Sequence, residues 1–86
     1  MTPDQYELLP ETLRDGVRQY IKYGIKPGAF LTAVIEGDLY EARARADMWN
    51  ATRLMQIAKW FADHAPAESF GSPELMAAWM KKRRGA

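Results

Sequence analysis

The stretch YGIKPGAF, residues 23–30, joins two apolar segments and decides how the chain begins to fold. Gly24 follows a run of apolar residues at helical spacing, and glycine often closes a helix because it adopts the left-handed conformation without strain. Pro27 and Gly28 precede the second apolar run and are suited to open a new helix. The stretch therefore predicts a joint between two helices, with Ile25 turned back into the core.

The same glycines raise the alternative of a phosphate-binding loop. Such loops converge several backbone N–H groups on an anion, with the glycine spacing GxxxxGK[ST] or GxGxxG. The segment GIKPG has neither spacing and loses one N–H to Pro27. A helix-turn-helix DNA reader is also disfavoured, because the segment after the joint offers few polar side chains to read bases. We expect no cofactor and no small-molecule ligand.

Helical periodicity extends on both sides of this joint. Pro10 suits the first turn of a helix that ends at Gly24, and a second, shorter helix ends at Gly37. The apolar residues expected to face the core are Leu13, Val17, Tyr20 and Ile21 in the first helix, and Phe30, Leu31, Val34 and Ile35 in the second.

The third expected helix is the longest, from residue 39 to about residue 64, because neither proline nor glycine interrupts it. Asp38 suits its N-cap, and Glu41 suits the returning half of a capping box. Its apolar residues occupy two sides, which is typical of a helix between neighbours. We therefore expect it to be the central helix.

The last expected helix starts with Ser72 as N-cap and Pro73 in the first turn. Its apolar face carries Leu75, Met76, Trp79 and Met80. The whole chain of 86 residues then reads as one all-α domain, a small bundle of four helices, with flexible ends at about residues 1–8 and 82–86.

Composition narrows the functional classes. The chain has no cysteine, which removes disulfides, thiolate nucleophiles and the common structural zinc sites. No apolar run approaches the roughly 20 residues that cross a bilayer, and no signal-peptide pattern is present, so we expect a cytoplasmic protein without membrane contact. Residues 1–41 hold four basic and seven acidic side chains, and residues 42–86 hold eight and four. The basic excess lies at the end, without the broad footprint typical of nucleic-acid binders.

No arrangement of residues indicates catalysis. The single histidine, His64, is placed to interact with the end of the third helix rather than with a partner base or metal ligand. Asp38 and Glu41 have structural roles as caps, while Ser69 and Ser72 have no base nearby in the sequence. We predict no catalytic, cofactor or metal site and no enzyme.

Two constellations on the third helix are candidates for contact with a partner. Arg43, Asp47, Asn50 and Arg53 lie near one apolar arc, in the segment RARADMWNATR. They form either an internal network with Asp15, Asp38 or turn carbonyls, or a contact surface anchored by arginine and Trp49.

The stripe that contains Met48 and Met55 presents the same choice. Covered by the last helix through Leu75, Met76 and Trp79, it is core. Left open, it is an adaptable hydrophobic surface for a protein partner or a second copy of the chain, which would make a homodimer.

The basic end is the candidate for polyanion binding. Lys81, Lys82, Arg83 and Arg84 follow one another near the negative end of the last helix. They are either a solvated terminus or the source of weak, salt-sensitive contacts to nucleic acid.

An ordered set of segments resembles a group of small phage and prophage proteins. The set comprises an LP start, a block Y..GI..G.FL.AV...DL, the triplet RAD and a late GSPE...AW, and it spans residues 9–79. The resemblance implies an accessory protein made inside a bacterial cell, and it brings no reaction or cofactor with it. Our first hypothesis is a helical protein-binding module that modulates a host or phage machine, of accessory or anti-defence type. The alternative is a small nucleic-acid-binding or regulatory protein that uses the basic C-terminal helix.

Overall fold

Residues 23–30 join two helices in the computed structural model, which describes residues 3–85. Helix α2 (Glu11–Tyr23) ends at Gly24, whose φ of 69° is left-handed and whose N–H donates to Tyr20 O. Helix α3 (Ala29–Ile35) begins after Gly28, where the backbone is extended. The joint is confirmed. Ile25 is exposed, however, so its expected place in the core is wrong.

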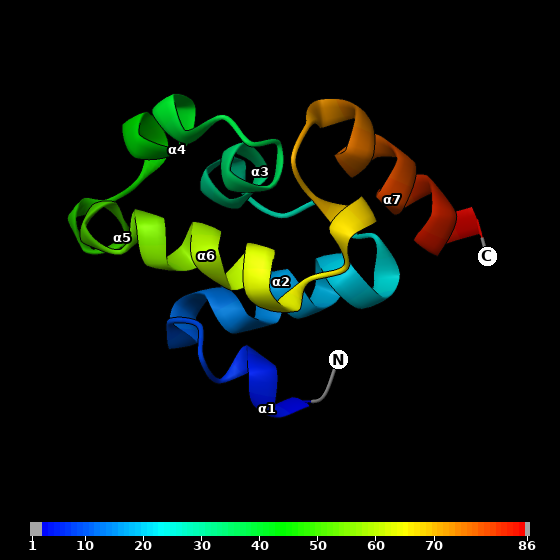
Figure 1. Ribbon diagram of the computed structural model, residues 1–86, viewed down its shortest axis with the longest axis horizontal. Helices are drawn as coiled ribbons and strands as arrows, with labels where there is room; N and C mark the ends of the chain where they lie inside the picture. Colours follow the sequence, from blue (N-terminus) through cyan, green and yellow to red (C-terminus); the bar gives the residue numbers. More distant parts are fainter. Residues whose placement is uncertain (1–2, 86) are drawn as a thin grey trace.

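The other elements are also helical. Among residues 3–85 there is no β-strand, which confirms the all-α class. Figure 1 shows their arrangement, with α7 beside the 3-10 helix η1. They are α1 (Pro3–Tyr6), α4 (Leu39–Arg45), α5 (Met48–Thr52), α6 (Leu54–His64), η1 (Ala67–Ser69) and α7 (Pro73–Gly85).

The expected long third helix is divided into three. Ala46 and Asp47 adopt extended backbone between α4 and α5, and Arg53 has φ −112° and ψ 6° between α5 and α6. The first break has a local cause, because the Asp47 carboxylate accepts a hydrogen bond of 2.7 Å from Asn50 N–H. Aspartate competes in this way with helix continuation and acts as an N-cap. The expectation of one continuous central helix is therefore wrong.

The core combines the apolar faces of these short helices. All four expected residues of α2 are buried, as are the expected Leu31, Val34 and Ile35 of α3, while Phe30 packs partly buried against them. Helix α6 contributes an aromatic pair, since the rings of Trp60 and Phe61 meet edge to face. Its buried residues are Leu54, Ile57, Trp60 and Phe61.

Hydrogen bonds from buried side chains tie distant segments to this core. The Tyr20 hydroxyl on α2 donates to the carbonyl of buried Ser69 in η1 at 2.5 Å. The Trp79 indole on α7 donates to Tyr20 O at 3.3 Å, and the Trp60 indole on α6 donates to Gln5 O in α1 at 2.7 Å. These bonds fix α1, η1 and α7 around α2 and α6.

The two ends of the described chain are helical. Helix α1 places Tyr6 in the core against the Trp60 ring, and α7 continues to Gly85. Of the expected flexible ends, residues 1, 2 and 86 lie outside the described residues. Within residues 3–85, no helix combines the length and the apolar character needed to cross a bilayer.

Candidate functional site

The two methionines singled out in the sequence lie at the surface. Met48 on α5 is 86% exposed and Met55 on α6 is 69% exposed. Helix α7 packs against α2 and η1, and it buries Met76 and Trp79 there rather than over α5 and α6. The interpretation of this stripe as covered core is therefore wrong, and the open interpretation describes it.

Trp49 and the half-buried Arg53, four residues later, form a second feature at the surface. The Arg53 guanidinium carbon lies 4.0 Å from the centroid of the Trp49 ring, within the range of a cation–π interaction. Trp49 is nevertheless 58% exposed, so one side of this pair remains available to solvent. The stacking holds two large side chains in place before any partner arrives.

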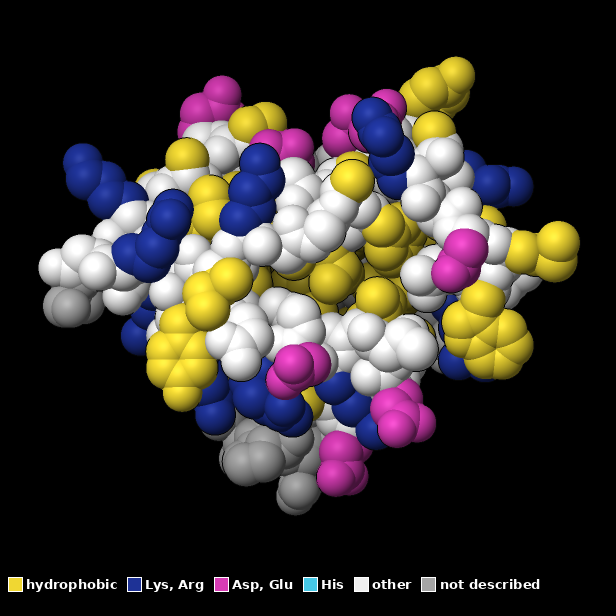
Figure 2. All heavy atoms as spheres, turned by 180° about the vertical axis from the view of Figure 1, so that it is seen from behind, with side chains coloured by type: hydrophobic (Ala, Val, Ile, Leu, Met, Phe, Trp, Pro, Cys, Tyr) yellow, Lys and Arg dark blue, Asp and Glu magenta, His cyan; other side chains and the backbone are white. Residues whose placement is uncertain are grey.

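Met48, Trp49, Arg53 and Met55 together are called the Met48–Met55 surface below. Met48 and Trp49 lie on α5, Arg53 lies at the break between α5 and α6, and Met55 lies in the first turn of α6. Figure 2 shows hydrophobic side chains projecting from the side of the molecule where α4 and α5 lie. Methionine, tryptophan and arginine are the residue types that protein interfaces favour.

The expected internal network around this surface does not form. Asp47 caps α5, and no ion pair joins it to Arg43, which is exposed and has no ion-pair partner among residues 3–85. Arg53 contacts Trp49 rather than Asp15 or a turn carbonyl. Asn50 Oδ1 is buried and has no hydrogen-bond partner within the described chain. These polar residues therefore do not fasten the helices to one another.

The basic end has mixed surroundings. Lys82 forms an ion pair of 3.0 Å with Glu68, and its ammonium group lies 5.4 Å from the Trp79 ring centroid. The Arg83 guanidinium carbon lies 4.6 Å from the same centroid. Lys81 and Arg84 are exposed and make no ion pair within residues 3–85. Lys82 and Arg83 thus contact side chains of η1 and α7, whereas Lys81 and Arg84 do not form such contacts within residues 3–85.

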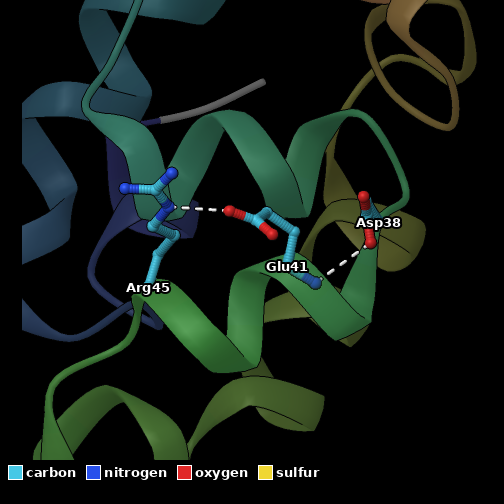
Figure 3. Close-up of polar contacts among 3 residues, drawn as sticks. All are labelled: Asp38, Glu41 and Arg45. Carbon is cyan, nitrogen blue, oxygen red and sulfur yellow. Dashed lines mark hydrogen bonds and ion pairs between the residues drawn. The ribbon is translucent and has the colours of Figure 1, made fainter.

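Asp38 and Glu41 serve the structure of α4, as Figure 3 shows. The Asp38 carboxylate accepts a hydrogen bond of 3.0 Å from Glu41 N–H, which confirms the N-cap. The Glu41 carboxylate pairs with Arg45 Nε at 2.7 Å, so the expected return to Asp38 N–H is wrong; Asp38 N–H donates to Ala33 O instead. Nowhere in the described chain do three His, Cys, Asp or Glu side chains gather as metal ligands. His64 ends α6 beside the Trp60 ring.

The sequence reasoning missed a second group of cations near the basic end. Arg14, Arg18 and Lys22 recur at intervals of four along α2, which places them on one face of that helix. This periodicity was a usable signal. The proximity of Lys22 to Arg83 could not be predicted, because it depends on the packing of α7 against α2.

Comparison of the chain with protein-family models, with curated proteins and with solved structures finds no match. A functional proposal therefore depends on the geometry described above and on the sequence pattern.

Proposed function

We propose that this chain is a small helical protein-binding module without catalytic activity, which modulates a host or phage protein machine. The observation that carries the proposal is the exposure of the Met48–Met55 surface. Large apolar side chains that a small domain leaves uncovered are typical of sites for protein contact. The phage setting, of accessory or anti-defence type, rests on the resemblance of the ordered sequence segments.

Trp49 and Arg53 are the proposed anchors of the interface. A partner that covers the free side of the tryptophan ring would exclude water from the ring and from the guanidinium group, which strengthens the cation–π contact. Met48 and Met55 add unbranched, adaptable side chains to the proposed interface. Arg43 contributes an unpaired charge at the rim, where it acts on the rate of association more than on affinity.

The proposal predicts a saturable partner in lysate from phage-infected bacteria. Trp49→Ala or Arg53→Glu should weaken capture by about thirtyfold, the effect of losing an anchor worth ~2 kcal/mol. Met55→Ser and Arg43→Glu should weaken capture less. Leu8→Ser is the matched control for Met55→Ser, because Leu8 is 66% exposed and lies outside this surface. Circular dichroism and thermal unfolding check that each variant stays folded.

Unchanged capture by folded Trp49→Ala and Arg53→Glu variants would reject the surface as the binding site. A second copy of the chain is the competing occupant. Light scattering tests it directly: a dimeric mass that becomes monomeric in Met55→Ser but not in Leu8→Ser would assign the surface to self-association.

A further inference from the structure

Helices α2 and α7 bring cationic side chains together where their C-terminal ends meet. Arg18 and Lys22 lie one turn apart near the end of α2. Gly24, which follows α2 in a left-handed conformation, lies very close to α7. A Cβ added to Gly24 would be 3.0 Å from Arg83 Cβ. Arg83 is therefore placed beside the end of α2 by the backbone packing itself.

A cleft of about 240 Å³ lies between these groups, lined by Tyr6, Ile21, Lys22, Pro66 and Arg83. None of its lining residues is acidic, and neither Lys22 nor Arg83 forms an ion pair within residues 3–85. The cleft thus places two positive charges from different helices, neither in an ion pair, beside Tyr6, Ile21 and Pro66.

Two arginines lie over aromatic rings, and Arg18 also forms an ion pair of 3.6 Å with Asp15. The Arg83 guanidinium carbon lies 4.6 Å from the Trp79 centroid, and that of Arg18 lies 5.1 Å from the Tyr6 centroid. Burial raises the pKa of the Tyr6 hydroxyl, and the charges of Arg18 and Arg83 oppose this rise, which agrees with both arginines lying near this hydroxyl. Stacked guanidinium groups lose little freedom when they bind an anion.

The chemistry fits a phosphate group. A cavity of this size has room for one phosphate, and arginine with lysine is the usual pair of donors to phosphate oxygens. Tyr23 follows Lys22 in the sequence at the end of α2, and its side chain is 56% exposed and open to contact with a ligand. Figure 2 shows exposed hydrophobic atoms beside Lys and Arg side chains on the side of the molecule where the chain ends.

We propose that this cleft binds a backbone phosphate of single-stranded nucleic acid, and that Tyr23 stacks on a neighbouring base. Cations that follow the backbone, combined with an aromatic platform, are the recurring elements of single-strand recognition. Lys81 and Arg84, exposed on α7, extend the charged path beyond the cleft.

Other polyanions fit these observations less well. Duplex DNA presents a stiff array of phosphates to a broad basic surface, whereas this chain has a net charge of only +1. A helix that lies on a membrane exposes an apolar face to the lipid. Helix α7 buries its large apolar residues Met76 and Trp79 in the core, and its last turns expose Lys81, Lys82, Arg83 and Arg84. A flexible strand can place one phosphate in the cleft and a base on Tyr23.

The test is fluorescence anisotropy with a labelled oligothymidylate of about 20 nucleotides, titrated with the full chain at several salt concentrations. Arg83→Gln should weaken binding about eightfold in about 50 mM salt and lower the salt slope by about 0.7, the effect of one lost phosphate contact. Lys22→Glu removes a contact and adds a negative charge, so it should weaken binding by more than Arg83→Gln. Arg43→Glu, a charge reversal outside the cleft, should cause a smaller change. Tyr23→Ala should weaken binding, and Tyr40→Ala, which removes another exposed tyrosine, should not.

Lys22→Glu separates this proposal from binding by the basic run alone. If Arg83→Gln weakens binding but folded Lys22→Glu does not, the composite cleft is rejected. Absence of oligonucleotide binding rejects it as well. So does a result in which Lys22→Glu weakens the binding of inorganic phosphate or of phosphatidylserine vesicles but not the binding of the oligonucleotide. If Lys22→Glu unfolds the chain, Lys22→Gln replaces it, with an expected loss of binding in the same direction.

Discussion

Gly24→Ala is the substitution to which the fold should be most sensitive in the joint between α2 and α3. Gly24 has φ 69°, and a left-handed backbone costs an alanine about 1–2 kcal/mol. The new Cβ would also lie 2.8 Å from Met80 O in the α7 backbone, closer than real Cβ contacts. Because backbone cannot rotate away as a side chain can, α7 must shift, and we expect a total loss of about 2–3 kcal/mol.

The joint supplies its own control. Gly28 has φ −66°, and beyond its chain neighbours no heavy atom lies within 4 Å of the position that a Cβ would take, so Gly28→Ala meets neither strain nor contact. Alanine lowers the conformational entropy of the unfolded chain, which stabilises the fold, but it is a weaker N-cap than glycine, so the net change should stay within about 0.5 kcal/mol. Urea unfolding followed by circular dichroism measures both variants. In thermal unfolding, Gly24→Ala should lower the Tm by about 10–20 °C.

Gly24→Asn separates the two causes of the expected loss. Asparagine tolerates the left-handed conformation better than alanine but carries the same Cβ. Stability near that of wild type in Gly24→Asn would assign the loss to backbone strain, and stability near that of Gly24→Ala would assign it to the contact with α7. Equal stability of Gly24→Ala and Gly28→Ala would refute both causes, and with them the close packing of α7 on α2.

Two further predictions concern stability. Burial raises the pKa of Tyr20 above its ordinary value, so the unfolded chain loses this proton first, and stability should fall above about pH 10 by about 1.4 kcal/mol per pH unit. Tyr20→Phe should be less stable at pH 7 by about 1–3 kcal/mol, because Ser69 O loses its hydrogen-bond donor. Its stability should fall less steeply above about pH 10. If urea unfolding at about pH 8–11 shows the same loss of stability in Tyr20→Phe and wild type, the loss does not come from Tyr20. Asp47→Ala should cost about 1 kcal/mol by removing the N-cap of α5, and Asp47→Ser should retain most of it; equal stability of the three proteins in urea would show that the cap does not hold the break.

The helix faces could be predicted from the sequence because their signals are local. The core residues of α2 follow from helical spacing, and the ends at Gly24 and Gly37 follow from the left-handed conformations that glycine favours. The caps at Asp38 and Ser72 are likewise confirmed by hydrogen bonds to the backbone three residues later. Each of these features depends on residues within one turn of one another.

The candidate sites could not be predicted to the same degree, because they depend on which helix covers which. Residues 39–64 contain no proline or glycine, yet the helix is interrupted at Asp47, whose side chain accepts a hydrogen bond from the backbone. In a sequence, an aspartate indicates a helix break less strongly than proline or glycine does. The exposure of Met55 depends on the position of α7, and the proximity of Lys22 to Arg83 depends on the same packing. Periodicity places a residue on a face but does not say what lies opposite that face.

The position of α7 links both proposed surfaces. Its apolar residues Met76 and Trp79 can pack against one part of the core only. The close approach of α7 to Gly24 places them against α2 and η1. Because α7 packs against α2 and η1, it does not cover Met55, and the Met48–Met55 surface stays exposed. The same placement brings Arg83 to Lys22 and creates the cationic cleft. A single glycine at the end of α2 therefore influences two sites on different sides of the molecule, although it would touch the ligand of neither.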